Sequence, residues 1–146
     1  MVQEVVTKVT LESFRERSAG KKVVLLYPWT NYRTLFLTHF YQNNRAGLLY
    51  YRITEEQTSL TTWLAGLVAE FNNANIGFGS ALKSALDSRK KAVALAEGLA
   101  ADLAAIKAEH TTLYIDELDR IPFDGEFDKF INALVNALPS HAQLVF

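Results

Sequence analysis

Residues 111–120 read TTLYIDELDR, an apolar run that passes directly into acidic side chains. KVVLLY, at residues 22–27, is a second apolar run without alternation, a pattern typical of a strand that is covered on both faces of a parallel sheet. GLLYYRI, at residues 47–53, is rich in aromatic and branched side chains, and AQLVF closes the chain at residues 142–146. These stretches predict four strands.

Apolar residues at helical spacing separate the predicted strands. Thr58 is placed to cap a helix whose apolar stripe repeats every three or four positions. The members of that stripe are Leu60, Trp63, Leu64, Leu67, Val68 and Phe71. Further stripes predict a helix over residues 31–42, a short helix around residues 82–86, an alanine-rich helix around residues 95–106 and a last helix around residues 127–138. Gly98 lies inside the alanine-rich helix and weakens its prediction.

Strands that alternate with helices favour an α/β fold. Right-handed crossovers then give a parallel sheet with helices on both faces. We divide the chain into an N-terminal segment at residues 1–20 and a domain at residues 21–146. Because the chain ends inside a predicted core strand, we expect an incomplete domain that is truncated at its C-terminal strand.

The composition is that of an ordinary globular domain and excludes several classes of function. The chain has 146 residues, of which 49% are hydrophobic and 21% charged, and its net charge is -1. A charge so close to zero gives no reason for this chain to bind nucleic acid or an anionic membrane directly. The absence of cysteine excludes thiol nucleophiles, disulfides and thiolate metal sites. With no long apolar segment in the sequence, we expect a cytoplasmic domain.

Asp116 and Glu117 are the first candidate site residues, because they follow a predicted strand directly. Ligands of open parallel sheets gather at the carboxyl ends of the strands. A phosphate-transfer site needs one carboxylate for magnesium and a second to orient or deprotonate water. The same residues also fit a plain strand followed by a solvated acidic turn, and taken alone they favour that interpretation.

Four stretches, in order along the chain, resemble parts of one family. They are ESFRERSAGKKVVLLYP at residues 12–28, GLLYYRITEEQTSLTTWLAGLVAEF at residues 47–71, TTLYIDELDRI at residues 111–121 and PSHAQLVF at residues 139–146. They resemble the nucleotide-binding core of the signal-transduction ATPases with numerous domains (STAND), especially bacterial transcriptional activators similar to the maltose-regulon activator. The resemblance implies a three-layer P-loop NTPase-like fold, in which TTLYIDELDRI corresponds to the Walker B strand.

The phosphate-binding motif departs from the family pattern. In the form G-x-x-x-x-G-K-[ST], Tyr27 and Tyr32 stand at the two glycine positions, Arg33 at the lysine position and Thr34 at the magnesium-binding hydroxyl position. Glycine is used in such a loop because it leaves the backbone amides free to approach phosphate closely. Arginine keeps the charge of lysine but not its compact ammonium group. The resemblance therefore implies a degenerate nucleotide site.

Two functions follow from the resemblance as expectations. The first is a NACHT/STAND-like domain of a signal-responsive transcriptional regulator, with weak or no ATP binding. Such a domain acts as a switch or interaction scaffold. Its partners are downstream domains of a longer protein and, through self-association, other copies of the chain. The second is a slow ATPase in which Thr34 and Asp116 hold Mg²⁺, Arg33 contacts the phosphates of ATP or ADP, and Glu117 polarises water. The resemblance implies no cofactor other than ATP or ADP with Mg²⁺.

A third alternative is an unrelated parallel α/β module, for instance one that is receiver-like or flavodoxin-like. Strand order separates these alternatives. The P-loop interpretation places the strand at residues 111–115 beside the strand at residues 22–27, with the strand at residues 47–53 outside it.

Overall fold

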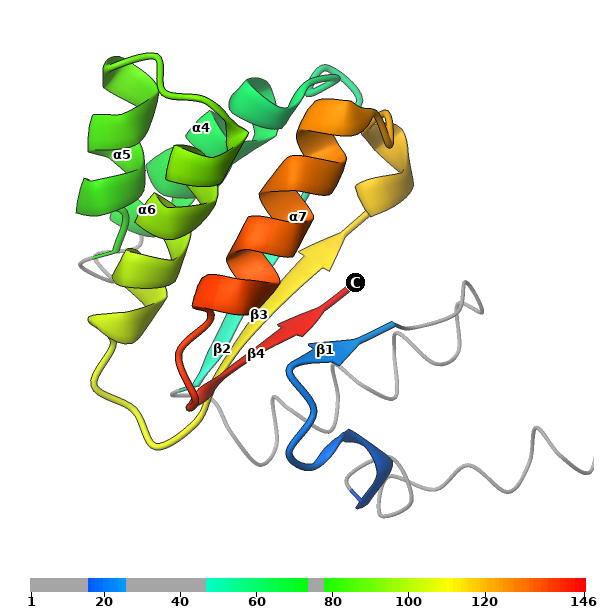
Figure 1. Cartoon of the computed structure of the whole chain (residues 1–146), viewed down its shortest axis with the longest axis vertical. Helices are drawn as coiled ribbons and strands as arrows, with labels where there is room; N and C mark the ends of the chain where they lie inside the picture. The colour runs from blue at the N-terminus through cyan, green and yellow to red at the C-terminus, as the bar shows by residue number, and fades with distance from the viewer. Residues whose placement is uncertain (1–15, 26–46, 74–77) are drawn as a thin grey trace, which may run out of the picture.

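The computed structural model describes residues 16–25, 47–73 and 78–146 and has an α/β architecture (Figure 1). The strands are β1 (Val23–Val24), β2 (Leu48–Arg52), β3 (Thr111–Asp116) and β4 (Ala142–Val145). The helices are α4 (Leu60–Asn73), α5 (Ser80–Asp87), α6 (Ala92–Ala104) and α7 (Gly125–Ala137), with a 3-10 turn, η1, at Leu118–Arg120. The helix predicted over residues 31–42 lies outside the described residues.

The described strands form one sheet in the order β1-β4-β3-β2, and every neighbouring pair is parallel. The predicted parallel α/β fold is therefore confirmed, as is the position of β2 outside β3. The prediction that β3 lies beside β1 is wrong, because β4 pairs with both, and Leu144 is in register with Val23 on one side and Leu113 on the other. Leu144 and Val145 are fully buried on opposite faces of the sheet, as expected for an inner strand that is covered on both faces.

The strand order therefore lacks the pairing of β1 with β3 that the P-loop interpretation predicts, and it also argues against the receiver-like and flavodoxin-like alternatives. In the flavodoxin-like order the first two strands are neighbours. Here β1 and β2 are at opposite ends of the described sheet. The carboxyl ends of all four parallel strands still share one edge of the sheet, which is where a ligand site is expected.

The described helices α4 to α7 all lie on one face of the sheet (Figure 1). The connections from β2 to β3 and from β3 to β4 step across the sheet in the same direction, so two right-handed crossovers place their helices on the same side. Side chains of odd number on β2 and β3, such as Tyr51 and Leu113, face these helices and form the main core. Tyr114 and Val145 are buried on the opposite face, in a second, smaller cluster. The sequence predicts helices on both faces of the sheet. The helices α4 to α7 account for one of these faces.

None of the described helices could span a membrane. The longest of them, α4, has 14 residues, whereas a bilayer needs about 20.

The start of α4 corrects one prediction. Thr58 was expected to cap this helix, but Ser59 takes that position. The Ser59 hydroxyl accepts a hydrogen bond from the Thr62 amide (3.3 Å), and the Thr62 hydroxyl accepts one from the Ser59 amide (3.1 Å). This reciprocal pair satisfies two backbone donors at the start of the helix, as in a capping box.

Gly98 does not interrupt α6, although it is a poor helix former. A Cβ at this position would lie 3.1 Å from the Leu82 Cα and 3.2 Å from the Ala81 carbonyl oxygen. The glycine therefore allows the backbones of α5 and α6 to pack closely. The packing of these two helices outweighs the helix propensity of one residue.

Asp102 of α6 caps the start of α5. Its side chain is 5% exposed and accepts hydrogen bonds from the backbone amides of Ala81 (3.0 Å) and Leu82 (2.9 Å). The residue before α5 is Gly79, which has no side chain that could supply these bonds. A carboxylate from a neighbouring helix thus replaces the usual local cap and matches the positive end of the helix dipole.

We expect Asp102→Ala to lower the free energy of unfolding by about 2 to 3 kcal/mol, because a partly buried and a buried amide at the start of α5 lose a charged acceptor. Urea denaturation monitored by circular dichroism measures the change. Asp87→Ala is the matched control, since Asp87 is an exposed carboxylate of α5 in an ion pair with Lys83, and its loss should cost less than about 1 kcal/mol. Equal losses for the two variants would contradict the capping role of Asp102.

Candidate functional site

The candidate site lies where β3 ends and the chain turns into η1. Asp116 is the last residue of β3 and is 7% exposed. Glu117 follows with φ 64 and ψ 36, the left-handed region that side chains other than glycine and asparagine seldom adopt. The Arg120 amide donates to the Glu117 carbonyl at 3.1 Å and closes the turn. Such backbone strain persists only where surrounding contacts hold it, and it is often found at functional sites.

Both carboxylate oxygens of Asp116 accept hydrogen bonds from donors of the fold. Oδ1 accepts from the Glu117 amide at 2.9 Å, and Oδ2 accepts from the Tyr50 hydroxyl at 2.7 Å. Tyr50 reaches Asp116 because it lies two positions before Arg52, which is in register with Asp116, so both side chains are on the same face of the sheet.

The Tyr50 hydroxyl is a donor that stays protonated. Burial raises the pKa of Tyr50 above its usual value, and the hydrogen bond and the negative charge of Asp116 raise it further. The Tyr50 ring also packs against the ring of Tyr114 on β3, with the two centroids 5.3 Å apart. Tyr50 therefore presents a fixed O–H group to the carboxylate.

Glu117 is held between two arginines. Its Oε1 lies 3.5 Å from Arg52 Nη2, and its Oε2 lies 3.8 Å from Arg120 Nε. Arg120 is anchored in turn, because its Nη1 donates to the carbonyl of Ile53 at 2.8 Å. The Glu117 side chain is 19% exposed, whereas that of Arg52 is 60% exposed. The ion pair with Arg120 is thus the better ordered of the two, since a mostly exposed arginine adds little.

The structure brings together two of the four predicted site residues. Asp116 and Glu117 are adjacent at the predicted end of β3. Arg33 and Thr34 lie outside the described residues, as do Tyr27 and Tyr32. Within the described ranges, no group of three or more histidine, aspartate or glutamate side chains is placed to hold a metal ion.

Sequence reasoning missed the parts that Tyr50 and Arg52 take in this site. Both are on β2, 66 and 65 positions before the carboxylates that they contact. The parallel register of β2 with β3 places Arg52 opposite Asp116. The signal in the sequence is that the apolar runs of β2 and β3 both end in a charged residue, Arg52 and Asp116. The parallel register brings these two ends together.

Two of the acidic residues that follow Glu117, Asp124 and Glu126, have structural roles. Asp124 Oδ1 accepts from the amides of Glu126 (3.1 Å) and Phe127 (2.9 Å) and caps α7. Glu126 pairs with Lys129 at 3.0 Å. The negative charge of this stretch is therefore partly used to start α7.

No protein-family model matches this chain, and a search of the curated proteins found no match.

We expect Tyr50→Phe to lower the free energy of unfolding at neutral pH by about 1 to 2 kcal/mol, because Asp116 loses one donor. Since the pKa of Tyr50 is raised in the folded state, the stability that its hydroxyl contributes is fully present below about pH 10 and declines as the pH rises further.

Urea denaturation of both proteins between neutral pH and pH 11 tests this expectation. The difference in stability should narrow above the usual tyrosine pKa of about 10. A difference that stays constant or widens would contradict the raised pKa and the donor role of Tyr50.

Proposed function

We propose that this chain is a degenerate nucleotide-binding domain, similar to those of STAND regulators, which acts as a switch or interaction scaffold with weak or no ATP binding. The single observation that carries the proposal is the state of the acidic pair. Asp116 accepts hydrogen bonds from Tyr50 and from the Glu117 amide, while Glu117 pairs with Arg52 and Arg120. The two carboxylates that an ATPase would use for magnesium and water are engaged within the fold.

The sequence of the phosphate-binding motif supports the same conclusion. Tyr27 and Tyr32 replace the glycines that let backbone amides approach a phosphate, and Arg33 replaces the lysine. Thr34 alone keeps the residue type of the motif. A site that lacks both the amide cradle and a free pair of carboxylates has little with which to hold a triphosphate.

The proposed scaffold belongs to a cytoplasmic regulator of transcription that responds to a signal. Its partners would be downstream domains of a longer chain, and it would not contact nucleic acid directly, because its net charge is close to zero. The complete fold would have three layers.

One observation favours a second candidate, a slow Mg²⁺-dependent ATPase. Asp116 and Glu117 lie together at the carboxyl end of β3, in the order that phosphate transfer requires. In this candidate Thr34 and Asp116 hold Mg²⁺, Arg33 contacts phosphate, and Glu117 polarises water. This candidate requires Asp116 to bind Mg²⁺ through a lone pair that its hydrogen bonds from Tyr50 and the Glu117 amide leave open.

Thermal unfolding with and without millimolar Mg-ATP separates the two candidates. We expect Mg-ATP to leave the midpoint of unfolding unchanged. Samples with Mg²⁺ alone and with ADP are measured in parallel as controls. A specific site at a hundredfold excess of ligand over Kd would instead stabilise the fold by about 2.7 kcal/mol. An increase in the midpoint with Mg-ATP that Asp116→Ala abolishes would overturn the scaffold proposal in favour of the ATPase.

A further inference from the structure

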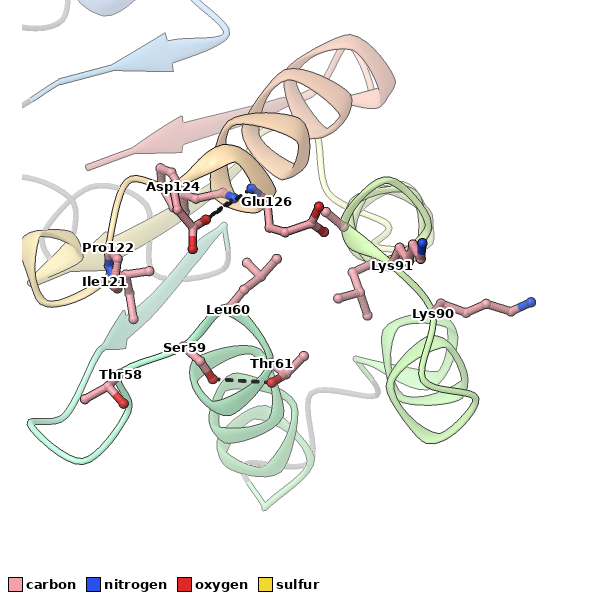
Figure 2. A pocket seen from close by; sticks show the side chains of 13 residues that line it. Thr58, Ser59, Leu60, Thr61, Lys90, Lys91, Ile121, Pro122, Asp124 and Glu126 are labelled. Atoms are coloured by element: carbon pink, nitrogen blue, oxygen red, sulfur yellow. Dashed lines mark hydrogen bonds between the residues drawn. The ribbon is translucent and has the colours of Figure 1, made fainter.

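A pocket lies between the starts of α4, α6 and α7, on the helical side of the sheet (Figure 2). Its volume is about 360 Å³, at the lower end of the range for pockets that bind small groups. The apolar part of its lining comes from Leu60, Leu95, Ile121 and Phe127. This pocket involves none of the residues proposed for nucleotide binding.

An exposed aromatic side chain stands next to this pocket. Phe123 is 66% exposed, and it lies in the chain between Pro122 and Asp124, which both line the pocket. Its ring stacks on the ring of Phe127 at 4.9 Å, with an interplanar angle of 26°. The stacking places the Phe123 ring beside Phe127, which lines the pocket. Exposed aromatic side chains beside an apolar hollow are typical of association surfaces.

The charges around the pocket complement each other. Lys90 and Lys91 come from the segment before α6, and Asp124 and Glu126 come from the start of α7 (Figure 2). Among the described residues, neither lysine forms an ion pair with a carboxylate. In a two-fold contact, the lysines of one copy would face the acidic residues of the other, and the reverse.

From these observations we propose that this face joins two copies of the chain about a two-fold axis, with Phe123 of each copy filling the pocket of the other. Because the axis is two-fold, the same contact is made twice and neither the aromatic side chain nor the pocket is left for a third copy, so the assembly stops at a dimer. The proposal is independent of nucleotide binding, so it would hold for either function considered above.

The first test is the mass of the protein in solution, measured by sedimentation over a range of concentrations up to millimolar. We expect a dimer that dissociates on dilution. Phe123→Ser should weaken association by about 1,000-fold, because it removes two aromatic anchors from each dimer, each worth about 2 kcal/mol. Leu25→Ser is the matched control, because Leu25 is 74% exposed and follows the edge strand β1, and it should leave association unchanged.

Charge reversal gives a second test, on side chains at the surface. Lys91→Glu and Glu126→Lys should each weaken association by about fivefold through like-charge contacts, and the double variant should recover most of the loss. Circular dichroism checks that every variant is folded. The proposal would be overturned if the chain is monomeric throughout the range or assembles beyond a dimer. It would also be overturned if the dimer is insensitive to Phe123→Ser or to the charge changes.

Discussion

The arrangement of the domain depends on the burial of β3 from both sides. All six residues from Thr111 to Asp116 are buried, and the strand pairs in parallel with β2 and β4. Successive side chains of β3 therefore point alternately to the face covered by the helices and to the opposite face. The burial of β3 also fixes where the strand must end, because Asp116 is the first carboxylate that the run carries, and it needs partners to remain in the sheet.

Those partners determine what the acidic turn can do. Tyr50 and the Glu117 amide satisfy Asp116, and Arg52 and Arg120 hold the side chain that follows it. A turn of this kind stabilises the edge of the sheet and keeps Glu117 in a left-handed conformation. Removing a buried carboxylate from its donors costs free energy, so a metal ion would have to offer more than these contacts provide.

Much of the fold follows from the sequence, because apolar runs and helical stripes record burial directly. The strand ending at Asp116 and the apolar stripe of α4 were predictable on that basis. Interactions between distant elements were not, as Asp102 shows: in the sequence it is one acidic residue among alanines, and only the packing of α6 on α5 makes it a cap. The place of β4 between β1 and β3 was missed for a similar reason, since burial identifies an inner strand but not its neighbours.

The central claim is that Asp116 keeps its hydrogen bonds with Tyr50 and the Glu117 amide and binds no metal ion. A crystal structure of the protein grown in millimolar Mg-ATP tests this claim most directly. We expect the Tyr50 hydroxyl to remain on Asp116 Oδ2, 2.7 Å away, with no ion bound to the carboxylate. A magnesium ion about 2.1 Å from an Asp116 oxygen, with a nucleotide phosphate beside it, would contradict the account.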